Sequence, residues 1–356
     1  MPTEEQVRSA LTRVMDPELG RNIVELGMVR DVAVDGPRVA FTLALTTLAC
    51  PLKERLAGEA RAAVEALEPG LVVNVRLAEM AEDERRALFG ARAAAPTPAQ
   101  ELSHIERVVA VMSGKGGVGK SAVAALLAVA LRRQGRRVGV LDADITGPSI
   151  PRMFGLHEPP GMSPAGMIPV ESRTGIKVMS INLLLPAEDE AVIWRGPLIS
   201  GAIRQFWTDV LWGDLDALIL DLPPGTSDAA LTVMQSIPLN GVIMVTSPQD
   251  LAGMVVRKAA HLASELHVPI IGLIENMSYV LCPDCARKVQ VFGPSFAGRT
   301  AAELGVPLLG SLPLDPELAR RADAGQIEDY AGEAFAPLAA AVWERIPAVK
   351  CKPVLG

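Results

Sequence analysis

The sequence is poor in aromatic residues and carries no excess of positive charge. Aromatic residues make up 4% of the 356 residues, and the formal net charge is −7. This acidic balance provides no general basic field for nucleic acid, so we expect no nucleic-acid partner. No apolar run approaches the roughly 20 uncharged residues of a membrane span, and the N-terminus lacks a signal-peptide pattern. We therefore expect a cytoplasmic protein that does not bind a membrane.

Cysteine is also scarce. The four cysteines are unevenly spaced, at Cys50, Cys282, Cys285 and Cys351. Such a set does not make the disulfide framework of a small secreted protein. We expect the cysteines to be available as thiolates.

The length suggests two domains, and the pattern changes along the chain accordingly. Residues 1–90 predict a small α+β domain, with helices over 3–14 and 51–67 and strands over 29–34, 38–45 and 71–77. Residues 91–103 are rich in alanine and proline and lack periodicity, which predicts a semi-rigid linker.

Residues 104–356 alternate between strand-like apolar runs and helical stretches. This alternation predicts an α/β fold with a doubly wound, mostly parallel sheet. The expected strands cover 108–112, 137–141, 217–221, 241–246 and 269–275, and 177–182 is a further candidate. In such sheets the chemistry gathers at the carboxyl ends of the strands.

The first of these strands runs into the phosphate-binding pattern Gly-x-x-x-x-Gly-Lys-Ser, and a helix is expected from Ser121 to Arg133. The glycines let backbone N–H groups turn inward, and together with the helix N-terminus these attract phosphate oxygens. Lys120 is expected to reach the β- and γ-phosphates, and the Ser121 hydroxyl to bind Mg²⁺. The predicted nucleotide-binding residues of this loop are Gly114, Lys115, Gly116, Gly117, Val118, Gly119, Lys120 and Ser121.

Aspartates end two other strands. Asp142 and Asp144 follow the second strand, and this spacing suits Mg²⁺ coordination and orientation of the attacking water. A helix-cap or turn role remains open for one of the two. Asp221 closes an apolar run, which is the Walker B arrangement, and is expected to hold Mg²⁺ through water or Ser121.

A Cys-x-x-Cys pair, Cys282 and Cys285, follows the last expected strand. Two thiolates at this spacing can bind a metal centre, but a tetrahedral zinc site or a cubane cluster needs four ligands. The chain has no second such pair, and a homodimer would complete the set. An iron–sulfur cluster, a structural zinc, a redox pair and chance all remain open; the residues Met277 to Leu281 before the motif disfavour a thioredoxin-type redox pair.

These motifs together resemble the Mrp branch of the MinD/ParA/Mrp/nitrogenase-iron-protein group of P-loop ATPases. Lys115 matches the additional lysine of that group's P-loop. Further matches are Trp194-Arg-Gly-Pro197, Asp221-Leu-Pro-Pro-Gly-Thr226 and Ser247-Pro-Gln-Asp-Leu251. One departure is visible over Pro294 to Arg299, where relatives usually carry consecutive glycines and a glutamate, which puts the flexibility of that loop in doubt.

The resemblance assigns roles to several of these residues. It implies a slow ATP hydrolase in which Lys115, Lys120 and Asp144 are catalytic, with Lys115 reaching the phosphates across a homodimer and Asp144 positioning the water. It also implies that Ser121, Asp144 and Asp221 are magnesium ligands, and that Cys282 and Cys285 bridge a 4Fe–4S cluster between subunits. Asn276 would contact adenine, although the sequence alone is equally consistent with a turn-forming asparagine.

The N-terminal region resembles a second known family. The stretch from Asp16 to Val29, with Glu18, resembles the signature of a small iron–sulfur-assembly helper domain, whose cysteine matches Cys50. Cys50 precedes an expected helix, whose N-terminus would lower the pKa of its thiol. A small buried apolar role for Cys50 remains equally open.

The sequence therefore predicts an ATP-binding carrier that is homodimeric, holds a 4Fe–4S cluster and transfers it to apo iron–sulfur proteins, with cluster scaffolds as further partners. Two alternatives remain. A MinD/ParA-like spatial regulator would need a basic amphipathic C-terminal helix, whereas the tail over 343–356 is interrupted by two prolines. A zinc-binding ATPase acting as a metallochaperone would use the same residues as the carrier.

Overall fold

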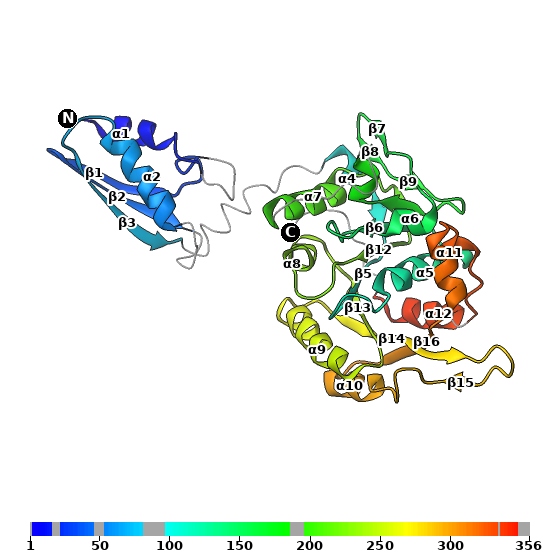
Figure 1. Ribbon diagram of the computed structural model, residues 1–356. Helices are drawn as coiled ribbons and strands as arrows, with labels where there is room; N and C mark the ends of the chain where they lie inside the picture. The colour runs from blue at the N-terminus through cyan, green and yellow to red at the C-terminus, as the bar shows by residue number, and fades with distance from the viewer. Residues whose placement is uncertain are drawn as a thin grey trace. The chain divides into compact units, whose positions relative to one another are not determined.

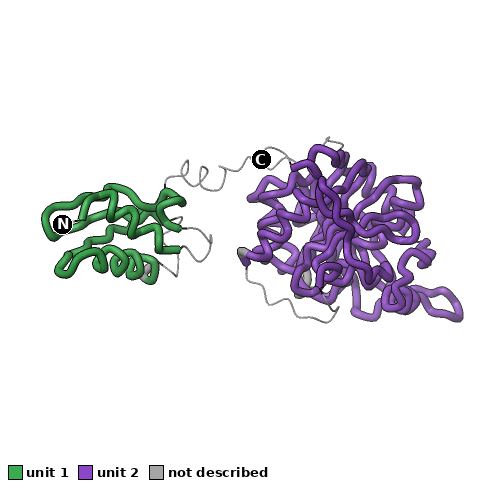
Figure 2. Tube along the Cα trace, turned by 90° about the horizontal axis from the view of Figure 1, so that it is seen from above, with its two compact units in different colours: residues 1–94 green, residues 95–356 purple. Residues whose placement is uncertain are grey.

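The computed structural model describes residues 2–15, 22–45, 53–80, 97–185, 196–333 and 335–347. The chain divides into two compact units, Met1–Ala94 and Ala95–Gly356 (Figure 2). Several residues singled out in the sequence lie outside the described residues, namely Asp16, Glu18, Cys50, Trp194 and Cys351.

The first unit packs two helices on a three-stranded sheet of order β1-β2-β3. The elements are α1 (Glu4–Leu11), β1 (Val29–Asp35), β2 (Arg38–Leu45), α2 (Lys53–Glu65) and β3 (Val72–Glu79), in the order expected. Strand β2 pairs antiparallel with β1 and parallel with β3. Val39, Phe41 and Leu43 alternate along β2 and are fully buried, which places the core of this unit on one face of its sheet.

The second unit is built on a nine-stranded sheet of order β15-β14-β13-β5-β12-β6-β10-β9, with β16 also paired to β14 (Figure 1). The strands are β5 (Val108–Ser113), β6 (Val138–Asp142), β9 (Val170–Glu171), β10 (Lys177–Met179), β12 (Ala217–Asp221), β13 (Gly241–Thr246), β14 (Ile270–Leu281), β15 (Lys288–Val289) and β16 (Leu308–Pro313). All pairings are parallel except those of β9 and β15. The predicted doubly wound, mostly parallel sheet is confirmed.

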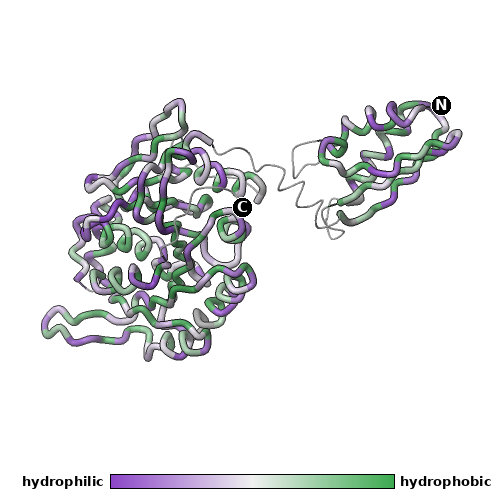
Figure 3. The backbone as a smooth tube through the Cα atoms, turned by 180° about the vertical axis from the view of Figure 1, so that it is seen from behind, coloured by the Kyte–Doolittle hydropathy of each residue, from purple (hydrophilic) through white to green (hydrophobic). Residues whose placement is uncertain are grey.

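Helices cover both faces of this sheet (Figure 1). One face carries α5 (Lys120–Arg133), α6 (Ile150–Phe154), α11 (Pro316–Asp323) and α12 (Phe335–Arg345), and the other carries α7 (Gly196–Thr208), α8 (Asp228–Ser236), α9 (Asp250–Glu265) and α10 (Ala297–Leu304). The central strand β5 serves both layers: Val109 and Val111 join the core beneath α5, while Val108, Ala110 and Met112 join the opposite core. Figure 3 shows the resulting hydrophobic interior as green segments running through this unit.

Short elements complete the second unit. They are α4 (Pro98–Glu101), the β4–β11 pair (His104–Ile105 and Asp214–Leu215), the β7–β8 hairpin (Gly161–Ser163 and Gly166–Ile168) and the 3₁₀ turns η1 (Ile181–Leu184) and η2 (Ile327–Asp329). Residues 97–103, the end of the range expected to be a linker, pack on this unit: Thr97 caps α4 and Ala99 is buried. Among the described residues, no helix is both long and apolar enough to cross a membrane.

Several strands differ from the sequence expectation. The strand expected to end at residue 275 continues to Leu281, and the one expected over 177–182 ends at Met179, where Ser180 turns the chain into η1 by accepting a hydrogen bond from the Asn182 amide. Strands β9 and β15 were not expected, and neither was β16, with the sequence Leu-Leu-Gly-Ser-Leu-Pro. The pairing of β16 with β14 supplies the hydrogen bonds that local sequence preference does not predict.

Candidate functional site: a phosphate-binding loop and a cysteine hairpin

The P-loop lies at the carboxyl edge of the central strands, between β5 and α5. Gly117 and Gly119 have φ values of 79° and 76°, the left-handed region that glycine adopts without strain. The loop, together with Asp144 and Pro224, lines a cleft of about 260 Å³. The predicted loop residues and Asp144 are therefore brought together in space.

A buried ion pair lies at the start of α5. The Nζ of Lys120 is 2.5 Å from Oδ1 of Asp221, and both side chains are buried. Burial raises the pKa of the Asp221 carboxyl, while the charge of Lys120 and a hydrogen bond from Ser121 oppose that rise. The second oxygen, Oδ2, has no hydrogen-bond partner within the described residues. A carboxylate with an unused buried oxygen beside a serine hydroxyl is a hard-oxygen set that fits Mg²⁺.

The two aspartates after β6 have different surroundings. Asp142 is fully buried, and its Oδ2 accepts hydrogen bonds from the Ser149 and Ile150 amides and from the Ser180 hydroxyl. Burial, followed by the nearby charge of Asp221, raises the pKa of Asp142 to about 7. Asp142 therefore anchors the start of α6, which is the capping role left open by the sequence.

Asp144 instead faces the cleft. Its Oδ1 accepts hydrogen bonds from the Thr146 hydroxyl and the Gly147 amide, both at 3.2 Å, so the carboxylate is held by its own turn. Its side chain lines the same cleft as the P-loop.

Lys115 has a partner that the sequence did not reveal. Its Nζ donates a hydrogen bond to Oε1 of Gln249, the residue that precedes α9. The P-loop also packs tightly on α9, because a Cβ on Gly114 would lie 2.5 Å from the backbone carbon of Val255. The segment Ser247–Leu251, to which the sequence assigned no chemical role, is thus part of the loop's surroundings.

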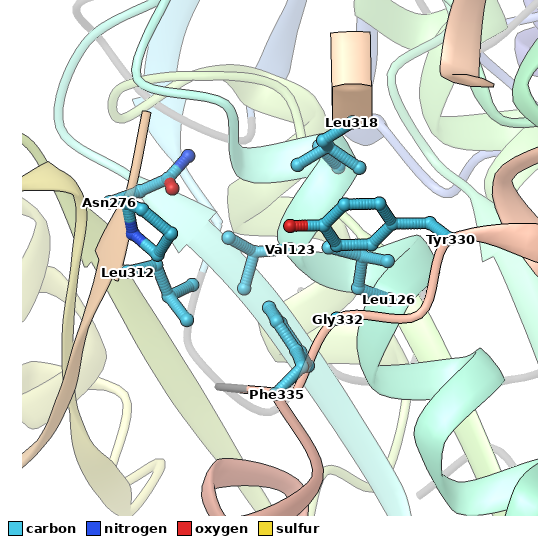
Figure 4. A pocket seen from close by; sticks show the side chains of 10 residues that line it. Val123, Leu126, Asn276, Leu312, Leu318, Tyr330, Gly332 and Phe335 are labelled. Atoms are coloured by element: carbon cyan, nitrogen blue, oxygen red, sulfur yellow. The ribbon is translucent and has the colours of Figure 1, made fainter. Parts of the chain in front are cut away.

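Asn276 supports the P-loop from the neighbouring part of the sheet. It is buried, and its Nδ2 donates a hydrogen bond of 2.9 Å to the carbonyl oxygen of Val118. Figure 4 shows it at one side of a small pocket of about 20 Å³, opposite Tyr330 and Phe335. The hydroxyl of Tyr330 donates to Asp315. These C-terminal pocket residues had no distinguishing signal in the sequence.

The two cysteines lie at the turn of a β-hairpin that extends from β14 into β15 (Figure 1). The turn is closed by hydrogen bonds from the Cys282 amide to the Arg287 carbonyl and from the Ala286 amide to the Cys282 carbonyl, both 2.9 Å. Backbone amides of Asp284 and Cys285, and the Cys285 thiol, donate to the Cys282 sulfur and lower its pKa. Both thiols are free, and Cys285 is exposed.

The hairpin therefore holds two sulfur ligands close together and favours the thiolate form of one of them. Across the described residues, no group of three or more histidine, cysteine, aspartate or glutamate side chains is placed to hold a metal ion. Four large hydrophobic side chains are exposed around the cysteines, namely Leu281, Val289, Val291 and Phe292.

Comparison with known proteins agrees with this architecture. Residues 104–346 match the family model described as NUBPL iron-transfer P-loop NTPase, and residues 4–77 match the one described as iron-sulfur cluster assembly protein. A Synechocystis protein named "Iron-sulfur cluster carrier protein" is 43% identical over 331 residues, which cover 91% of each chain.

Solved structures give the same picture. A nucleotide-binding protein from Archaeoglobus fulgidus, solved in complex with ADP, is 42% identical, with a TM-score of 0.59 over 69% of this chain and 94% of that one. The cell division ATPase MinD of Pyrococcus furiosus, at 22% identity and a TM-score of 0.50 over 67% of this chain and 99% of its own, shares the fold. The chain belongs to the family of iron-transfer P-loop NTPases.

Proposed function

We propose that this protein is an ATP-binding iron–sulfur cluster carrier. It holds a 4Fe–4S cluster between the Cys282–Cys285 pairs of two copies of the chain and transfers it to apo-proteins in the cytoplasm, with ATP binding and hydrolysis controlling the exchange. The observation that carries this proposal is the exposed hairpin with two free thiols, one of them with a lowered pKa.

The ligand count supports a shared site. A cubane cluster needs four protein ligands, and the hairpin supplies two thiolates. A second copy related by a two-fold axis would supply the other two. The exposed apolar residues beside the cysteines, such as Val289 and Val291, provide surface that such a contact would bury. Exposed cysteine ligands are also accessible to the apo-protein that would receive the cluster.

The P-loop would bind ATP, with the pocket beside Asn276 on the side of the nucleoside. Ser121 and Asp221 would hold Mg²⁺, which supplies neutralising charge at the β- and γ-phosphates. Lys120 would exchange its carboxylate partner for the phosphates, and Asp144 would orient the attacking water. Lys115 of each copy would leave Gln249 and reach the phosphates bound by the other copy, where it stabilises negative charge.

The N-terminal unit also has a proposed role in cluster transfer. We propose that residues 1–90 form an iron–sulfur-assembly domain joined through a linker to the ATPase domain, to which residues 97–103 already belong. Its match to an iron-sulfur cluster assembly family supports a role in receiving the cluster from scaffolds or passing it on.

Anaerobic reconstitution with iron and sulfide tests the proposal. We expect a brown protein with about two irons per chain, and transfer of the cluster to an apo-ferredoxin. The matched control is Cys50→Ala/Cys351→Ala, which should load normally, whereas Cys282→Ala/Cys285→Ala should remain colourless. A colourless wild-type protein that retains zinc would overturn the carrier assignment in favour of a zinc-binding ATPase.

A further inference from the structure

Glu275 is a buried carboxylate that directly follows an apolar run in β14. It follows the run from Ile270 to Ile274 in β14, and its exposed fraction is 0%. A buried carboxylate is costly unless hydrogen bonds satisfy it, and an aliphatic side chain would fill this position without that cost. We therefore expect the carboxylate to hold particular neighbouring segments in a fixed arrangement.

Its partners are serine hydroxyls from three segments. Ser278 donates to Oε2 at 2.5 Å, Ser295 donates to Oε1 at 2.7 Å, and Ser311 of β16 lies 3.5 Å from Oε2. Ser278 lies on the strand that leads out to the cysteines, and Ser295 lies on the chain that returns from them. One carboxylate thus ties together both ends of the cysteine hairpin.

The residues next to Glu275 touch the P-loop. Asn276 donates to the Val118 carbonyl, and a Cβ on Gly119 would lie 2.3 Å from Nδ2 of Asn276 and 3.4 Å from Cε of Met277. The loop backbone therefore packs directly against this part of β14. A shift of the loop would press on Asn276 and Met277.

This part of β14 is also irregular. Met277 has a φ of 58°, a left-handed conformation that a residue with a side chain seldom adopts. The register between β14 and β16 shifts between Glu275 and Tyr279. The strand is thus bulged at the point where it touches the P-loop, and bulges commonly re-aim the chain beyond them.

Beyond the bulge, the hairpin is braced along its length. Val280 pairs with Val289, and Leu281 pairs with Lys288. The Nζ of Lys288 also lies 4.3 Å from the centre of the Tyr279 ring. A change at residues 276–278 would therefore move the cysteines together with both legs of the hairpin.

We propose that Glu275 is a positioning residue that couples the nucleotide state of the P-loop to the cysteine hairpin through the bulge at residues 276–278. Phosphate binding at the loop displaces Asn276 and Met277, and the Glu275–Ser295 hydrogen bond carries the displacement to the returning leg. The inference rests on the proposed function, because it takes the P-loop as the nucleotide site and the cysteines as the cluster ligands.

Thiol alkylation in the reduced, metal-free chain tests this coupling. Iodoacetamide labelling of Cys282 and Cys285 is followed by peptide mass spectrometry, without nucleotide and with Mg²⁺ plus a non-hydrolysable ATP analogue. In the wild type we expect the analogue to change the labelling rate by about fivefold or more, the lower end of ordinary allosteric couplings. Glu275→Gln and Ser295→Ala should bring the ratio of the two rates close to one, while the Kd for the analogue stays near that of the wild type.

The matched control is Ser311→Ala, which removes the longest of the three contacts and should keep the wild-type ratio. A merely structural role for Glu275 would raise labelling equally with and without nucleotide and leave the ratio unchanged, and that result would overturn the proposal. So would a wild-type protein that binds the analogue without any change in labelling. Because no cluster is present, failure of cluster loading would contradict the proposed function without altering this result.

Discussion

The P-loop and the cysteine hairpin are built in opposite ways. The P-loop is enclosed by groups of the same chain: Lys120 pairs with buried Asp221, and Asn276 holds the Val118 carbonyl. The cysteine pair instead lies on an exposed hairpin beside uncovered apolar side chains. One chain thus arranges the side chains around its phosphate-binding loop by itself, whereas two thiols alone leave any four-ligand metal site to be completed from outside the hairpin.

The largest expected effect separates the two sites. Lys120→Ala should lower nucleotide affinity by more than about 100-fold, because it removes a cation from the phosphates, while cluster loading persists. Isothermal titration with an ATP analogue and iron analysis of the reconstituted protein measure the two. Cys282→Ala/Cys285→Ala is the converse variant and should lose the cluster but bind the analogue. Parallel loss of both properties in either variant would contradict the separation.

The next effect is a pH dependence of the free energy of unfolding that arises at Asp142, close to the P-loop. The pKa of Asp142 is raised to about 7 in the folded chain, above its ordinary value, so the folded state binds more protons than the unfolded state between roughly pH 4 and 7. The contribution of Asp142 to stability therefore falls as the pH rises through this window. Asp142→Asn removes the titration, so the free energy of unfolding of the variant, measured in urea, should rise relative to that of the wild type from pH 5 to pH 8, by roughly 2.5 kcal/mol at most. A constant difference between the two proteins would contradict the assignment.

A smaller effect is expected on the cysteine side. Val289→Ser/Val291→Ser should weaken cluster-dependent dimerisation by about tenfold. Each change places a hydroxyl where the dimer would otherwise bury an apolar side chain. Sedimentation of the loaded protein over a range of concentrations measures the dissociation constant. Met162→Ser, in the β7–β8 hairpin at 75% exposure, is the matched control and should leave the constant unchanged. Equal weakening by the control would argue against an interface at the cysteine hairpin.

The smallest effect concerns Lys115, which we propose leaves Gln249 to reach the phosphates bound by the other copy. Gln249→Glu should hold Lys115 in place by an exposed ion pair and slow dimer-dependent ATP hydrolysis by a few-fold, consistent with about 1 kcal/mol or less for such pairs. Gln249→Ala should not slow it. The ATPase rate is measured as a function of protein concentration for both variants. Equal rates would contradict the prediction that Gln249 restrains Lys115.

Much of this arrangement could be predicted from local pattern. The strand limits at Ala217–Asp221 and Gly241–Thr246 agree with the expectation, because buried parallel strands are apolar runs bounded by polar or turn residues. The P-loop was equally recognisable, since its glycines are required by backbone geometry. These features depend on residues that are neighbours in the chain.

The contacts that the sequence did not reveal join distant segments. Lys115 meets Gln249, Glu275 gathers hydroxyls from Ser295 and Ser311, and Tyr330 lines a pocket opposite Asn276. Gln249 and Ser295 lie in stretches that the family resemblance singled out, but local pattern does not say which distant residues they contact. The role of Asp142 as an anchor of α6 was open for a similar reason, because a strand-end aspartate can bind either a metal ion or a helix N-terminus.

The most direct test asks whether one chain can hold the cluster alone. Affinity-tagged wild-type protein is reconstituted anaerobically with an equal amount of untagged chain, captured through the tag, and analysed for iron and for the untagged partner. We predict that untagged wild-type chain is retained together with about four irons per pair of chains, and that untagged Cys282→Ala/Cys285→Ala chain is not retained by the cluster. In the mixture of two wild-type chains, a tagged chain that keeps its full iron content without any untagged partner would contradict the shared site.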